Sequence, residues 1–183
     1  MALKATVYKA ELQIADMDRN YYATHALTLA LHPSETEERL MLRLLAFARH
    51  ASDTLAFTKG ISTDDEPDLW AKDLTGAIEL WIELGQPDEK RVRKACGRVR
   101  EVIVYCHSGH SAELWWQKSR DKLERFDNLT VINLPVAACR QLGELAQRSM
   151  QLQCTLQDGQ VWLGDAAGSV EVAPETWKRT AGS

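Results

Sequence analysis

Strand and helix patterns alternate through the second half of the chain, and this alternation restricts the fold more than any other sequence feature. Residues 101–105 and 129–133 are short apolar runs rich in β-branched side chains, which predict strands. Residues 111–126 and 135–150 follow them with the apolar spacing of helices. Because strands joined by crossover helices pair in parallel, the sequence predicts an α/β fold: a mixed α+β sheet flanked by helices.

The two ends of the chain carry a different, strand-rich pattern. Apolar and polar residues alternate over residues 8–14 and, after a turn, again over residues 21–31, which predicts an N-terminal antiparallel hairpin. Residues 151–172 predict short C-terminal strands, with Asp158-Gly159 as a hairpin turn. No repeat, low-complexity segment or linker divides the chain, so we expect a single domain over residues 1–183.

Two further helices are predicted from their start signals. Ser34 and Glu37 have the spacing of an S-x-x-E capping box, which opens a helix that runs to about His50. Residues 87–98 begin with a proline followed by two acidic residues, a pattern typical of a helix start. Residues 78–85 alternate as a strand just before this second helix.

Composition limits the compartment and the classes of partner. No run of about 18 apolar residues occurs and the first residues lack a secretory signal, so we expect a cytoplasmic protein without membrane contact. Four scattered cysteines within apolar stretches predict reduced core thiols. A net charge of −4 gives no general attraction to nucleic acid, so any such contact must be local. The sequence also lacks a Walker loop and a dinucleotide fingerprint, which weighs against the common nucleotide enzymes.

The segments around Asp68 and Glu83 carry the most suggestive chemistry. Two carboxylates that converge from neighbouring strands can hold Mg²⁺ or Mn²⁺, which completes its shell with water and substrate phosphate. Glu79 shares a strand face with Glu83 but lies about 13 Å away, so both cannot bind one ion. We choose Glu83 because it lies near the strand end, beside Gly85. The alternative is that both glutamates are ordinary solvent-facing residues.

A basic segment and one glutamate on a predicted helix are the remaining candidates for a functional site. Residues 90–100 hold six basic residues and no acid, so Lys90, Arg91 and Lys94 are candidates for contact with nucleic-acid phosphates. A solvated helix face that balances nearby acids is the alternative. Glu38 leans toward the buried side of its helix and needs a partner, either a metal or its water, or an arginine.

Four segments together resemble the bacterial YaeQ family. They are HPSETEERL at 32–40, DDEPDLW at 64–70, LWIELG at 80–85 and RKAC at 93–96, and the similarity runs over nearly the whole chain. The resemblance implies a core similar to the PD-(D/E)XK nucleases, in which a mixed sheet is flanked by helices. It further implies that Asp68 is the first acid of the nuclease pattern, Glu83 the second acid and Glu38 the helix glutamate.

The lysine of that pattern is missing, because its position falls on Gly85. Some members of the superfamily take the lysine from the following helix, which here nominates Lys94. A helical wheel places Lys94 about 150° from the centre of the buried stripe of its helix, which counts against this role. Arg91 and Lys90 are the substitutes.

Two hypotheses of different classes follow. The leading one is a Mg²⁺- or Mn²⁺-dependent nuclease-like protein in which Asp68 and Glu83 bind the metal, Glu38 assists and Lys94 supports the attacking water. The second is a non-catalytic module that binds nucleic acid or protein and keeps the nuclease-like fold. It would use the basic helix or the pair Trp115-Trp116, although those tryptophans also suit a place half within the core.

Overall fold

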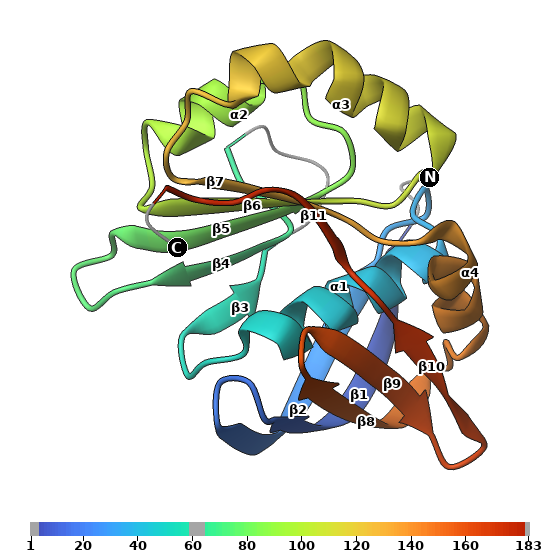
Figure 1. The fold of residues 1–183 in the computed structure, drawn as a ribbon. Helices are drawn as coiled ribbons and strands as arrows, with labels where there is room; N and C mark the ends of the chain where they lie inside the picture. Colours follow the sequence, from blue (N-terminus) through green and yellow to red (C-terminus); the bar gives the residue numbers. More distant parts are fainter. Residues whose placement is uncertain (1–3, 59–64, 182–183) are drawn as a thin grey trace. The chain divides into compact units, whose positions relative to one another are not determined.

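The computed structural model describes residues 4–58 and 65–181, which form two compact units (Figure 1). Unit 1 comprises Met1–Ala51 and Ala137–Pro174, and unit 2 comprises Ser52–Val136 and Glu175–Ser183. No helix in the described ranges is long and apolar enough to cross a membrane. The expectation of a single domain over residues 1–183 stays a prediction.

Unit 1 is built on a five-stranded mixed sheet with the strand order β10-β9-β8-β1-β2. Its elements are β1 (Thr6–Asp16), β2 (Tyr21–Leu31), α1 (Glu37–His50), α4 (Val136–Glu144), β8 (Ser149–Gln157), β9 (Gln160–Asp165) and β10 (Gly168–Val172). The predicted N-terminal hairpin is confirmed as β1 and β2, and β1 also pairs in parallel with β8. The predicted turn at Asp158-Gly159 joins β8 to β9, and both residues have positive φ, as such a hairpin turn requires.

The alternation seen in the sequence of β1 defines the core side of this sheet. Tyr8, Ala10, Leu12 and Ile14 are buried, whereas the residues between them are exposed. Buried residues of α1, such as Leu44, complete the core of unit 1. The apolar period therefore sets which face of the sheet is covered.

Unit 2 is built on a six-stranded mixed sheet with the strand order β11-β7-β6-β5-β4-β3. Its elements are β3 (Leu55–Phe57), β4 (Leu69–Lys72), β5 (Ile78–Leu84), α2 (Glu89–Cys96), β6 (Glu101–Cys106), α3 (His110–Leu123), β7 (Leu129–Asn133) and β11 (Glu175–Lys178). The predicted parallel pairing is confirmed for β6 and β7; β5 also pairs in parallel with β6, and the remaining strand pairs of this sheet are antiparallel. The crossover helices α2 and α3 lie on the same face of the sheet (Figure 1).

The core of unit 2 lies between this sheet and its two helices. Trp81 of β5, Val92 of α2 and Ala112 of α3 belong to one buried cluster. Trp115 and Trp116 are half-buried against that cluster, and Trp116 stacks on Trp177 of β11 with ring centroids 6.0 Å apart. The tryptophan pair therefore contributes to packing, one of the two roles that its sequence allows.

The predicted helix over residues 135–150 is too long. The structure ends α4 at Glu144, and Ser149 already begins β8, where it pairs with Lys9 of β1. Gly143 lies so close to α1 that a Cβ atom there would come within 3.1 Å of the Cα of Glu38. Because Ser149 pairs with Lys9, strand pairing with β1 outweighs the local helix pattern of residues 145–150.

The predicted capping box of α1 is also wrong by two residues. Thr36 is the N-cap, and its hydroxyl oxygen accepts a hydrogen bond from the backbone N–H of Arg39 at 3.2 Å. The hydroxyl of Ser34 instead pairs with the ring of His32, and Glu37 accepts a hydrogen bond from the hydroxyl of Tyr8. Both threonine and serine cap helices well, so sequence preference alone did not separate them.

The four cysteines are free thiols, as predicted. Burial raises the pKa of Cys96 to about 11 and those of Cys106, Cys139 and Cys154 to about 12. Because the thiolate is the reactive form, we expect a disulfide reagent such as DTNB at pH 8 to titrate at most the half-buried Cys96 in the native protein. All four thiols should react in denaturant, and rapid reaction of three or more in the native protein would contradict this burial.

Candidate functional site

Asp68 and Glu83 lie close to each other in unit 2, at the end of the strand pair formed by β4 and β5. Leu69 of β4 pairs with Ile82 of β5; Asp68 directly precedes Leu69, and Glu83 directly follows Ile82. The backbone N–H of Asp68 donates to the carbonyl of Ile82 at 3.0 Å. The charge of Asp68 acts on the carboxyl group of Glu83 and raises its pKa. The two predicted metal ligands are thus brought together.

Asp68 is fixed at the end of β5. Asp68 is buried, with 5 % of the residue exposed, and its Oδ2 accepts a hydrogen bond from the backbone N–H of Leu84 at 2.7 Å. This bond holds one carboxylate oxygen against the last residue of the strand that carries Glu83. The backbone at the end of β5 therefore helps to fix the position of Asp68.

Glu83 is equally buried, at 7 % exposure, and its charge is compensated by an arginine. The Nε of Arg91 donates to Oε1 at 2.8 Å and to Oε2 at 2.9 Å, and the indole N–H of Trp81 donates to Oε1 at 3.3 Å. The pKa of Glu83 is raised overall, mainly because of burial. Arg91 opposes this rise, and the nearby charge of Asp68 adds to it. Two acids are held close together at a cost in electrostatic energy, which is typical of functional sites.

The first turn of α2 places Arg91 beside this acid pair. Asp88 caps the helix by accepting a hydrogen bond from the backbone N–H of Arg91 at 2.8 Å. The guanidinium then reaches back to Glu83 and also donates through Nη2 to the carbonyl of Glu66 at 2.9 Å. From the sequence, Arg91 was predicted to bind phosphate or to substitute for the missing lysine, and not to pair with Glu83. Its pairing with Glu83 depends on the length of the turn between β5 and α2, which the sequence pattern does not fix.

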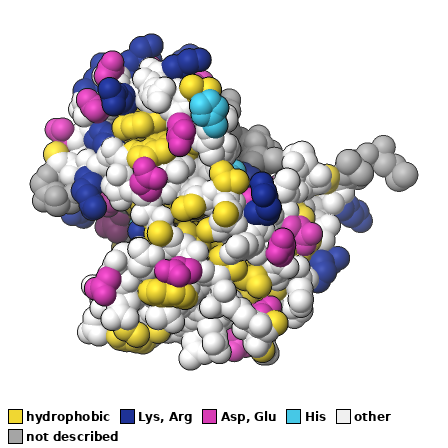
Figure 2. All heavy atoms as spheres, turned by 45° about the vertical axis from the view of Figure 1, so that its right-hand side comes forward, with side chains coloured by type: hydrophobic (Ala, Val, Ile, Leu, Met, Phe, Trp, Pro, Cys, Tyr) yellow, Lys and Arg dark blue, Asp and Glu magenta, His cyan; other side chains and the backbone are white. Residues whose placement is uncertain are grey.

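A pocket of about 310 Å³ opens at α2 and is lined by Asp88, Lys90, Arg91 and Lys94. Three of its lining residues are the basic residues that were predicted from the sequence to contact nucleic acid. Lys and Arg side chains are also frequent at the top of the view in Figure 2, over the helices of unit 2. The pocket is therefore a polar, positively charged recess that suits a phosphate group.

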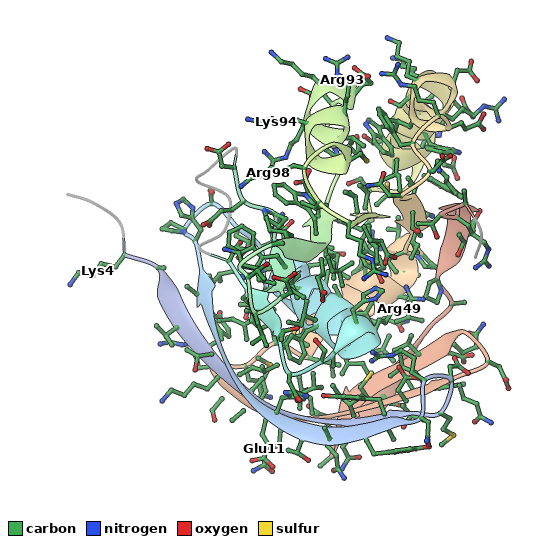
Figure 3. All side chains as sticks on the ribbon, turned by 90° about the vertical axis from the view of Figure 1, so that its left-hand side faces the viewer. Lys4, Glu11, Arg49, Arg93, Lys94 and Arg98 are labelled. Atoms are coloured by element: carbon green, nitrogen blue, oxygen red, sulfur yellow. The ribbon has the colours of Figure 1, made fainter. Side chains whose placement is uncertain are left out.

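Lys94 lies at the outer rim of this pocket. Its side chain is 66 % exposed and forms an ion pair with Asp65 at 3.3 Å, while Arg98 donates to the backbone carbonyl of Asp65 at 3.2 Å. Figure 3 shows Lys94 and Arg98 leaving α2 on the same side. Part of the basic face thus balances a neighbouring acidic segment, as in the alternative of a solvated helix face. Asp64, also in that segment, lies outside the described residues.

Gly85, at the position of the missing lysine, has a backbone that disfavours side chains. Its φ is +122°, and its N–H donates to the carbonyl of Tyr105 at 2.8 Å, although space around its Cα is open. We therefore expect Gly85→Ala to lower the free energy of unfolding by about 1–2 kcal/mol through backbone strain. Urea denaturation measures this, with Gly97→Ala as a matched control, since Gly97 has helical φ and room for a Cβ atom at ordinary contact distance. Equal stability of the two variants would contradict the prediction.

Glu38 belongs to unit 1, whereas Asp68 and Glu83 belong to unit 2. It lies in the first turn of α1, close to Gly143, and its charge raises the pKa of Cys139. Within the described ranges, no group of three or more His, Cys, Asp or Glu side chains is arranged to hold a metal ion. The roles assigned to Glu38 and Lys94, and the metal itself, stay predictions.

Known proteins resemble the chain over nearly its whole length. A family model described as YaeQ protein matches residues 1–174. Proteins called "Uncharacterized protein YaeQ" from Salmonella typhi and Escherichia coli K12 are 48% and 46% identical to it, and each alignment covers 98% of this chain and 99% of the relative. The crystal structure of YaeQ protein from Xanthomonas axonopodis pv. citri is 55% identical with a TM-score of 0.93 and covers 95% of this chain and 98% of that one. The Pseudomonas syringae YaeQ structure is 32% identical with a TM-score of 0.92, covering 97% and 98%.

Proposed function

The chain belongs to the YaeQ family, and from the geometry of its acid pair we propose that it is a nuclease-like protein that hydrolyses phosphodiester bonds of nucleic acid with Mg²⁺ or Mn²⁺. The observation that carries this proposal is the closeness of two buried carboxylates, Asp68 and Glu83, at the end of the β4–β5 pair beside a basic pocket. We further propose that unit 2 is related to the PD-(D/E)XK nuclease core. Four free thiols suit a reducing compartment, which supports a cytoplasmic location.

The donor set fits a hard divalent cation. Asp68 and Glu83 offer carboxylate oxygens, the ligands that Mg²⁺ and Mn²⁺ prefer, and their mutual repulsion favours a positive charge between or beside them. Arg91 provides that charge to Glu83 in the structure. When bound, the metal would polarise the scissile phosphate and lower the pKa of an attacking water.

The basic residues of α2 would hold the substrate backbone. Lys90, Arg91 and Lys94 line one pocket, and charge-assisted hydrogen bonds from these side chains to phosphate oxygens would fix the strand next to the acid pair. The exposure of Lys94 and its pairing with Asp65 support phosphate binding more than activation of water.

An assay with labelled oligonucleotides tests this function. Single- and double-stranded DNA and RNA are incubated with the protein in Mn²⁺, in Mg²⁺ and in EDTA, and binding is measured in parallel at several salt concentrations. The proposal predicts cleavage that EDTA abolishes and binding that weakens as salt rises. The absence of metal-dependent cleavage of all these nucleic acids would overturn the proposed hydrolysis, and the absence of salt-dependent binding as well would overturn the nucleic-acid contact.

A second candidate is a module that binds nucleic acid or protein without catalysis. Two observations favour it. The Nε of Arg91 contacts both carboxylate oxygens of Glu83, and position 85 is a glycine where the nuclease pattern has a lysine. In this case the ion pair is a permanent structural feature, and the pocket alone binds phosphate. Binding to oligonucleotides without Mn²⁺-dependent cleavage would favour the module.

A further inference from the structure

We propose that Arg91 is an exchangeable counter-cation of Glu83, and that a phosphodiester group in the α2 pocket draws Arg91 away so that Glu83 becomes available to a divalent metal. Phosphate and metal would then bind cooperatively. This inference rests on the proposed function, because it describes how the two ligands of the same site are coupled.

Arg91 occupies the place of the predicted cation at Glu83. Its Nε is shared between the two oxygens of Glu83, at 2.8 and 2.9 Å, so both potential metal-binding atoms are engaged. Among the described residues, no other basic side chain contacts Glu83, and the nearby Arg98 donates to Asp65 instead. A metal at Glu83 therefore competes with Arg91 for the same two oxygens, and its positive charge favours movement of the guanidinium away from them.

The same guanidinium is accessible from the pocket. The Arg91 side chain is 27% exposed, compared with 9% for that of Glu83, and it lines the recess of about 310 Å³ with Lys90 and Lys94. Guanidinium groups bind phosphate oxygens through paired hydrogen bonds, and a phosphodiester carries the negative charge that Glu83 now supplies. A phosphate in this pocket competes directly with Glu83 for Arg91.

Electrostatics couple the binding of a metal to Glu83 with the binding of a phosphate to Arg91. If Arg91 left alone, Glu83 would remain buried next to Asp68 without a counter-charge, which is costly. A divalent cation supplies the positive charge that Glu83 loses when Arg91 leaves. A phosphate supplies the negative charge that Arg91 loses when it leaves Glu83. By thermodynamic linkage, each ligand must then raise the affinity of the other by the same factor.

Calorimetric titration of Mn²⁺ tests the exchange without relying on activity. We expect dimethyl phosphate, which carries one phosphodiester charge, to tighten Mn²⁺ binding to the wild-type protein several-fold. We expect Arg91→Gln to bind Mn²⁺ at least about tenfold more tightly than the wild type in the absence of dimethyl phosphate, and to lose the effect of that ligand. Arg93→Gln is the matched control, since Arg93 lies on the same helix, is 53% exposed and pairs with Glu89.

The outcomes separate the exchange from the metal site itself. If Mn²⁺ binds the wild type, Arg91→Gln and Arg93→Gln with equal affinity, the exchange is overturned while the metal site stands. If Mn²⁺ binds none of them, with or without dimethyl phosphate, the metal site fails as well. If a thermal melt shows that Arg91→Gln does not fold, the wild-type titration still decides, because Mn²⁺ affinity that does not change with dimethyl phosphate overturns the exchange.

Discussion

The substitution Asp68→Asn is expected to lower Mn²⁺-dependent cleavage by at least about 100-fold while leaving the fold intact. Asparagine removes the charge that a metal needs but keeps an oxygen that can accept the hydrogen bond from the Leu84 N–H. It also removes the charge that raises the pKa of Glu83. We therefore expect the free energy of unfolding to change by less than about 1 kcal/mol, or to rise. Cleavage rates and urea denaturation of the same preparation measure both effects.

The control for this variant is Asp121→Asn, because the Asp121 side chain lies on α3 of the same unit and is 90% exposed. It should cleave like the wild type. Undiminished cleavage by Asp68→Asn would remove Asp68 from the proposed metal site. A large loss of stability would instead mean that the carboxylate has a structural role that an amide cannot fill.

The second large effect concerns binding. Replacing Lys90 and Lys94 together by glutamine is expected to weaken oligonucleotide binding at low salt by about tenfold or more, whatever the base sequence. Each lysine that contacts a phosphate contributes nearly one unit to the slope of log affinity against log salt for duplex DNA, so this slope should fall by about two. Both side chains line the α2 pocket, and neither belongs to the core, so the fold should survive. Fluorescence anisotropy at several salt concentrations gives the affinity and the slope.

Lys118 and Lys122 provide the comparison, since both are exposed on α3 of the same unit. Their double replacement by glutamine changes the net charge equally but leaves the pocket intact. Equal loss of affinity in the two double variants would indicate a diffuse electrostatic effect and contradict a specific phosphate site at α2. Unchanged binding in the Lys90/Lys94 variant would remove α2 from the nucleic-acid contact.

The sequence predicts most of this fold because its apolar periods are strong. The parallel strands β5, β6 and β7 and the hairpin of β1 and β2 follow from patterns that only one secondary structure satisfies. The predicted end of α4 is wrong, because residues 145–150 have a helical pattern but Ser149 pairs with β1, more than 100 residues away in the chain. Such long-range pairing is invisible to a local pattern.

The candidate site could be predicted only in part. The strand pattern and the family resemblance selected Asp68 and Glu83, and the pairing of β4 with β5 brings the two residues close together. The contact between Arg91 and Glu83 was missed because it depends on where the first turn of α2 falls relative to the end of β5. Lys94 was chosen by analogy, and its own position on the helical wheel already indicated the exposure that the structure shows.

The most direct test of the central claim is the stoichiometry of Mn²⁺ binding in the presence of dimethyl phosphate. Calorimetry should give one Mn²⁺ per chain for the wild type and for Asp121→Asn, and no saturable binding for Asp68→Asn or Glu83→Gln. Identical heats for all four proteins, or none for the wild type, would contradict a cation held jointly by Asp68 and Glu83.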